Sequence, residues 1–86
     1  MSTSRLPAVA PEEFIEFQRM FRWPGEPTYT FWRSEARKND ERFESMGIKV
    51  ERVVIRLDDA VAFCAEHGLP MTYVSLWKRV QELVPA

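Results

Sequence analysis

The residues of this chain that could do chemistry are few, and most lie in its C-terminal third. The sequence has one cysteine and one histidine. These residues, Cys64 and His67, are spaced so that they can share one face of a helix. A zinc site needs three or four ligands, so two residues predict no metal site. We expect Cys64 to fill space in the core and His67 to be a core histidine bonded to nearby carbonyls.

Other catalytic patterns are equally sparse. The three glycines are scattered at predicted corners, so they form no glycine-rich phosphate loop. Asp58 and Asp59 form an acidic pair, but the N-terminus of a helix favours carboxylates at such positions. The inventory therefore predicts a protein that is not an enzyme, with no catalytic residue, no cofactor and no bound metal.

The stretch from Arg56 to Val84 predicts two amphipathic helices joined by a tight corner. The first begins at Asp58, and Gly68 suits the left-handed position that ends it. Pro70 suits the first turn of the second helix, because an N–H at that position would have no hydrogen-bond acceptor within the helix. The second helix separates an apolar face from a polar face, which predicts which side chains are buried. The predicted inward residues are Tyr73, Val74, Leu76, Trp77, Val80, Leu83 and Val84.

This corner resembles the helix-turn-helix family of DNA-binding proteins over roughly 20 residues. The family usually has an aliphatic residue where this chain has His67. The residues that carry the resemblance are Phe63, Cys64, Gly68, Leu69, Val74 and Trp77.

The resemblance implies a transcriptional regulator whose last helix enters the major groove. Its nucleic-acid-contact candidates are Thr72, Ser75 and Arg79 for the groove, with Lys78 for the DNA backbone. The alternative is a helical hairpin that simply closes the core, because a glycine at a corner between two helices produces much of the same pattern.

Size and charge limit the classes of function. Eighty-six residues predict one domain. Twelve basic and 13 acidic residues leave a net charge of −1, so no global basic field attracts nucleic acid or an anionic membrane. One cysteine excludes an internal disulfide and suits a reducing compartment. No segment has the length of a membrane span or a signal peptide, so we expect a cytoplasmic protein with no membrane partner.

The rest of the chain predicts a flexible arm over residues 1–10 and a single small globular domain over 11–86. Proline followed by two acidic residues predicts a helix over 11–23, and Pro24 to Pro27 form a turn that stops it. Residues 28–30 are predicted as a loop or a strand stub. A charged helix follows over 31–46, and the β-branched run over 48–57 predicts the main strand.

A strand needs a partner for its backbone groups, and the sequence leaves three candidate partners open. The candidates are residues 28–32, residues 5–9 as an edge strand, or the same strand of a second copy about a two-fold axis. A strand followed by two helices is also similar to the ribbon-helix-helix family of dimeric DNA binders, here over about residues 49–84. The stretch from Leu57 to Gly68 is shorter than that family's first helix.

These features predict an α+β fold that is mostly helical, with about four helices, one main strand and a C-terminal helical hairpin. The leading functional hypothesis is a non-catalytic binding module that acts through protein–protein contacts, with a protein partner or as a homodimer. Its contact candidates are the aromatic residues Trp23, Tyr29 and Trp32. The alternative hypothesis is the DNA-binding regulator, with DNA as the partner.

Overall fold

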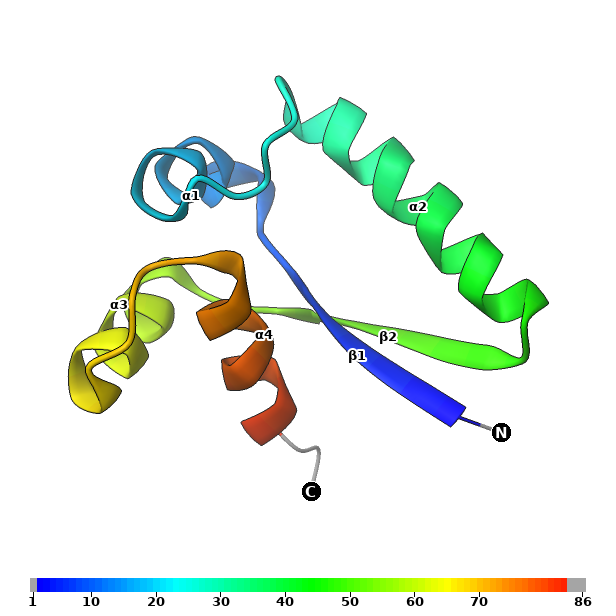
Figure 1. The fold of residues 1–86 in the computed structure, drawn as a ribbon. Helices are drawn as coiled ribbons and strands as arrows, with labels where there is room; N and C mark the ends of the chain where they lie inside the picture. Colours follow the sequence, from blue (N-terminus) through cyan, green and yellow to red (C-terminus); the bar gives the residue numbers. More distant parts are fainter. Residues whose placement is uncertain (1, 84–86) are drawn as a thin grey trace.

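Two parallel strands run side by side and support the four α-helices of the described chain (Figure 1). The computed structural model describes residues 2–83. Strand β1 (Ser2–Ala8) pairs with β2 (Ile48–Val54), with Ser2 opposite Ile48 and Ala8 opposite Val54. The N-terminal segment is therefore the partner of the main strand. Residues 2–8 are a paired strand, which corrects the prediction of a flexible arm over residues 1–10.

Pro7 fits into β1 because of the direction in which its backbone points. Ile55 N donates to the carbonyl of Ala8 at 3.0 Å, so the backbone groups of Ala8 face β2. Backbone direction alternates along a strand, so Pro7 faces the outer edge, where a missing N–H costs no ladder bond. A side chain covers that edge, since Gln81 Nε2 donates to the carbonyl of Arg5 at 2.8 Å.

The first helical region begins at Pro11, as predicted, and ends at Phe21, two residues before its predicted end. It consists of the 3-10 turn η1 (Pro11–Glu13) and helix α1 (Phe14–Phe21). Helix α2 (Tyr29–Ser45) begins two residues before its predicted start. The reason is Thr28, whose Oγ1 accepts from Phe31 N at 3.1 Å and so caps the helix. Residues 29 and 30 are therefore helical, where a loop or strand stub was predicted.

The main strand ends at Val54, three residues before its predicted end, because helix α3 (Leu57–His67) begins there. Glu13 Oε1 accepts from Leu57 N at 3.2 Å, which gives one free N–H of the new helix a partner from a distant part of the chain. Helix α3 ends at Gly68, whose φ of 62° is the left-handed conformation predicted for it. Cys64 is buried, as predicted, whereas His67 is exposed and lies against the ring of Phe63.

Helix α4 (Tyr73–Glu82) is shorter than predicted and buries a different face. Ser75 is only 3% exposed, although it was predicted to be in water. Trp77 and Val74 were predicted to be buried, yet they are 43% and 58% exposed. Val84, which was also assigned to the buried face, lies outside the described residues. The predicted orientation of this helix was therefore wrong.

Two polar contacts explain the orientation of α4. At its start, Ser75 Oγ donates to the carbonyl of Pro70, which draws the serine into the corner between α3 and α4. One turn later, Arg79 makes two bonds of 2.7 and 2.8 Å to the carboxylate of Asp59 on α3. These contacts turn α4 so that Leu76 and Val80, both fully buried, face the core.

The buried position of Ser75 gives a direct test. A Ser75→Leu substitution places a large side chain in a packed corner, so we expect it to lower the free energy of unfolding by about 1–3 kcal/mol. Val74→Leu is the matched control on the exposed neighbour and should change stability by less than about 0.5 kcal/mol. Urea unfolding measures both. Equal stability of the two variants would contradict the orientation of α4.

Candidate functional site

Helix α2 lies over the sheet with a hollow on each flank. Only Trp32 and Ala36 of its 17 residues are buried, so much of the helix is not packed tightly against the strands. The hollow on the α4 side, here called the aromatic cleft, has a volume of about 350 Å³ and is lined by Leu6, Trp23, Trp32, Phe43, Arg52 and Tyr73. The hollow on the other flank, the charged groove, has a volume of about 540 Å³ and is lined chiefly by Arg33, Arg37, Asp40, Glu41, Glu44 and Arg52.

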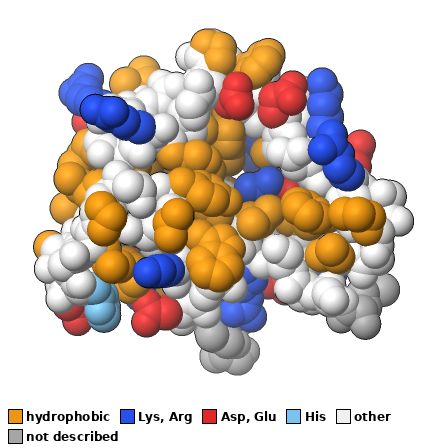
Figure 2. Space-filling view, viewed as in Figure 1, with side chains coloured by type: hydrophobic (Ala, Val, Ile, Leu, Met, Phe, Trp, Pro, Cys, Tyr) orange, Lys and Arg blue, Asp and Glu red, His pale blue; other side chains and the backbone are white. Residues whose placement is uncertain are grey.

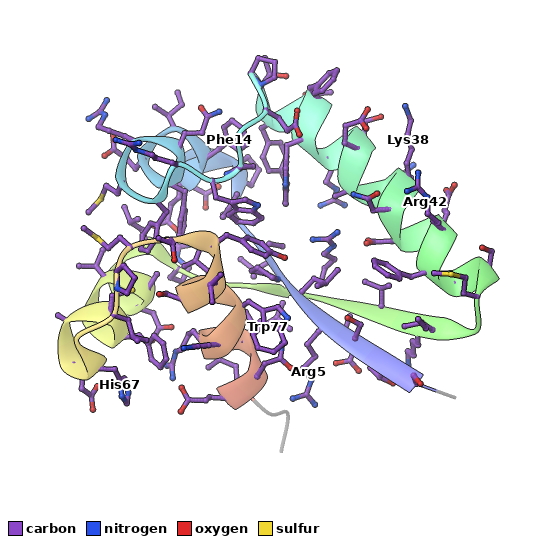
Figure 3. All side chains as sticks on the ribbon, viewed as in Figure 1. Arg5, Phe14, Lys38, Arg42, His67 and Trp77 are labelled. Atoms are coloured by element: carbon purple, nitrogen blue, oxygen red, sulfur yellow. The ribbon has the colours of Figure 1, made fainter. Side chains whose placement is uncertain are left out.

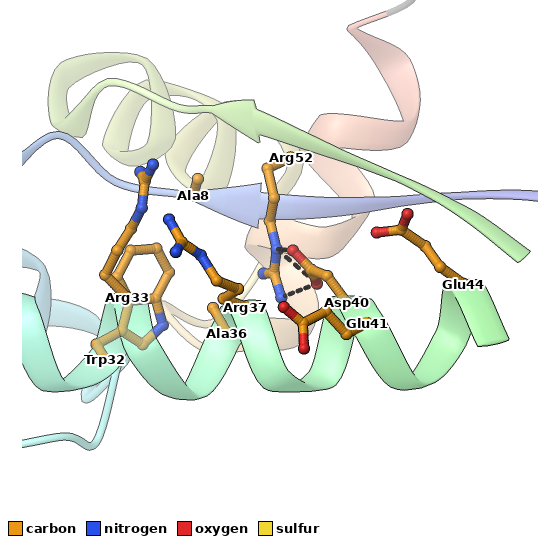
Figure 4. Close-up of a pocket in the computed structure, with 9 residues that line it drawn as sticks. All are labelled: Ala8, Trp32, Arg33, Ala36, Arg37, Asp40, Glu41, Glu44 and Arg52. Carbon is orange, nitrogen blue, oxygen red and sulfur yellow. Dashed lines mark hydrogen bonds and ion pairs between the residues drawn. The ribbon is translucent and has the colours of Figure 1, made fainter.

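Arg52 connects the two hollows. Its guanidinium reaches from β2 to Asp40 on α2, with Nη2 2.8 Å from Oδ1 and Nε 3.1 Å from Oδ2 (Figure 4). Nη1 donates to the carbonyl of Pro7 at 3.1 Å. The two side chains are 24% and 19% exposed. This paired arrangement of donors and acceptors is the strong form of a charged hydrogen bond, so it fixes α2 above both strands.

The three predicted protein-contact residues come together, but mainly as packing between helices. The Trp23 and Trp32 rings meet edge to face with centroids 5.6 Å apart, and Tyr29 lies 5.7 Å from Trp32. Trp32 is only 6% exposed, and the other two are half-buried. Trp23 also contacts Tyr73 of α4 at 5.2 Å. Trp23 and Trp32 therefore line the aromatic cleft, and Tyr29 supports it from behind through Trp32.

Trp77 is a surface aromatic residue that the sequence patterns missed. It lies one helical turn beyond Tyr73 on α4. It lines a separate hollow with Leu69 and with residues of α3 and α4, among them Phe63. Figure 3 shows Trp77 projecting from α4 on the side toward β1. Figure 2 shows hydrophobic side chains gathered across the centre of this face, beside a hollow. Trp77 was missed because the apolar periodicity of the last helix assigned it to the core.

The four nucleic-acid-contact candidates do not form one exposed face. Ser75 is buried, and Arg79 is bonded to Asp59 and lies over the ring of Phe63 at 5.5 Å. Thr72 and Lys78 are exposed. A groove-reading helix needs several free side chains on one face, and α4 presents only this exposed pair from the predicted set.

Two further findings concern the residues from 2 to 83. No group of three or more His, Cys, Asp or Glu side chains lies together there as a metal-ion site would require. Within the same range, none of the helices combines the length and the apolar character that crossing a membrane demands.

In comparisons with known proteins, no family model, no curated protein and no solved structure matches this chain.

The Arg52–Asp40 pair can be tested by a double-mutant cycle. Arg52→Met and Asp40→Asn each leave a partly buried polar group without its partner, so we expect each to lower the free energy of unfolding by about 1–3 kcal/mol. The double variant should lower the free energy of unfolding by less than the sum of the two single effects, with a coupling energy of about 1 kcal/mol or more. Additive effects in urea unfolding would show that the pair does not hold α2 in place.

Stability should also decline at alkaline pH. Burial raises the pKa of the Cys64 thiol and of the Tyr73 hydroxyl in the folded protein. A raised pKa means that folding favours the neutral form, so this contribution is complete below the unfolded pKa and is lost as the pH rises toward the folded pKa. We expect the free energy of unfolding to fall from about pH 8.5 upward. Urea unfolding across pH should show a smaller decline for the Cys64→Ala/Tyr73→Phe variant, and an unchanged decline would contradict this assignment.

Proposed function

We propose that this chain is a non-catalytic module that binds a protein partner through the aromatic cleft and Trp77. The observation that carries the proposal is the 43% exposure of Trp77 on α4. Trp77 lies one helical turn beyond Tyr73 of the aromatic cleft and lines a second hollow together with Phe63 and Leu69. An exposed tryptophan beside an apolar hollow is typical of a binding surface, because its burial against a partner removes a large apolar area from water.

The composition of the cleft supports a protein ligand. Protein interfaces are enriched in tryptophan, tyrosine and arginine at their centres and have polar rims. Here Trp23 and Tyr73 form the apolar wall, and Glu35 and Asn39 of α2 provide polar groups in the same lining. Such a cleft suits an apolar side chain of the partner, flanked by groups that donate hydrogen bonds to the rim.

The groups at the base of the cleft support binding rather than catalysis. Arg52 is already bonded to Asp40 and to a backbone carbonyl, and burial holds the Tyr73 hydroxyl in its neutral form by raising its pKa. General acid–base chemistry needs a group whose pKa lies near the working pH. The single free cysteine, Cys64, is buried, which is compatible with the reducing cytoplasm as the place of action.

Recognition of DNA by the last helix has less support. Two of its four candidate residues, Ser75 and Arg79, have their polar groups engaged within the chain. DNA binding therefore stays a prediction from the sequence.

A site-specific photo-crosslinker tests the proposed surface. A benzoyl-phenylalanine in place of Trp77 should give discrete covalent adducts with a protein partner on irradiation of cells that express the chain. The matched control carries the same group in place of Ile15 on α1, which is 67% exposed and lines neither the aromatic cleft nor the hollow beside Trp77. Adducts from the Trp77 position alone are the expected result, because only that position lies on the proposed binding surface of α4. Equal adduct patterns from both positions, or none from either, would reject this surface as the binding surface.

A further inference from the structure

The outer edge of β2 is open. The bond from Ile55 N to the carbonyl of Ala8 shows that Ile55 faces β1. Backbone direction alternates along a strand, so the N–H and C=O groups of Ile48, Val50, Arg52 and Val54 face away from β1. Within residues 2–83 the sheet has no third strand, and no hydrogen bond of the described residues reaches these groups. An open edge of this kind is a template for another strand.

The two edges of the sheet differ in whether another part of the chain covers them. The outer edge of β1 is covered by α4, whose Gln81 bonds to the carbonyl of Arg5. The open edge of β2 ends in Val54, whose side chain is 56% exposed. Exposed apolar side chains beside unpaired backbone groups favour addition of a strand over exposure to water.

The charges along β2 favour one self-pairing, in which opposite charges face each other. When two copies of a strand pair antiparallel about a two-fold axis, one residue lies opposite its own copy. An axis at Glu51 or at Arg52 sets like charges opposite each other, which is destabilising. An axis at Val50 sets valine against valine and brings Lys49 opposite Glu51 of the second copy, twice. Lys49 is exposed, and the Glu51 side chain is 35% exposed beside Arg5.

The charged groove on α2 has the same self-complementarity. Arg33, Arg37, Glu41 and Glu44 lie along one flank of the helix, with both bases before both acids. Because the opposite flank faces Tyr73 of α4, and α4 covers the β1 edge, we infer that the charged flank faces the open β2 edge, with Ala8 and Arg52 at its base. A two-fold axis perpendicular to α2 places the α2 helices of the two copies antiparallel. The arginines of one copy then lie opposite the glutamates of the other.

A single axis serves both pairings. Helix α2 and strand β2 are consecutive and joined at Gly47. At 1.5 Å per helical residue, the midpoint of the charged flank, near Asn39, lies about 12 Å from this turn. At 3.3 Å per strand residue, Val50 lies about 10 Å from the turn. The centre of the helix pairing and the centre of the strand pairing therefore fall within about 2 Å of the same level.

We propose that a second copy of this chain occupies the open edge, forming a two-fold homodimer. Its sheet has four strands, with β2 paired to β2 antiparallel about Val50. The charged grooves of the two copies face each other, with Arg37 against Glu41 and Arg33 against Glu44. This surface lies on the opposite flank of α2 from the aromatic cleft, so the homodimer and the proposed binding of a partner stand or fall separately.

Charge reversal on α2 tests the helix pairing. Sedimentation equilibrium of the unmodified chain should give twice its mass of 10.1 kDa. Arg37→Glu and Glu41→Arg each place like charges together at two symmetric contacts, so each should raise the dimer dissociation constant roughly tenfold or more. The Arg37→Glu/Glu41→Arg variant restores opposite charges and should restore the dimer. Both residues are exposed, and circular dichroism confirms that each variant is folded.

A cysteine at the axis tests the strand register. Residues that face each other in an antiparallel pair have Cα atoms about 5.5 Å apart, within the range of a disulfide. Val50→Cys should therefore form a covalent dimer under mild oxidation. Val54→Cys is the matched control, because this exposed residue lies far from its own copy in the proposed register and should stay uncrosslinked. A monomeric chain, a dimer insensitive to the charge swap, or efficient crosslinking only through Val54→Cys would overturn the proposal.

Discussion

The fold depends on the contact that Arg52 makes with Asp40 and with the carbonyl of Pro7. This guanidinium joins three segments that are distant in sequence: the first strand, the long helix and the second strand. Helix α2 buries only Trp32 and Ala36, so apolar packing alone holds it weakly. A bidentate pair that is largely shielded from water is costly to break, because each partner would remain as an unpaired charge. The hollows on both flanks of α2 exist because this pair, rather than close packing, sets the distance between helix and sheet.

Local signals in the sequence predicted most of the elements. Gly68 ends α3 in the left-handed conformation, and Pro24 follows the end of the first helical region, because each residue acts through its own backbone geometry. The β-branched run from Ile48 gives the main strand. The α+β, mostly helical class could therefore be read from the sequence. Helix ends differed wherever a side chain from elsewhere intervened, as Glu13 does at the start of α3.

The orientation of α4 and the exposure of the site residues could not be predicted in this way. Apolar periodicity assumes that a helix buries its most hydrophobic face. Here Ser75 is buried because a carbonyl at the corner accepts its hydroxyl, and Arg79 is held by a carboxylate on α3. Both contacts depend on where two helices cross, which single-helix patterns do not contain. As a result Trp77, assigned to the core, is on the surface, and Trp32, proposed as a contact, is buried.

The bond between Gln81 and the carbonyl of Arg5 joins positions 76 residues apart. During synthesis, the first strand leaves the ribosome long before β2 exists to pair with it, and before α4 exists to cover its outer edge. Non-local pairing of this kind is slow to form and leaves strand edges exposed in the meantime. The outer edge of β1 therefore gains its cover only once α4 has been synthesised.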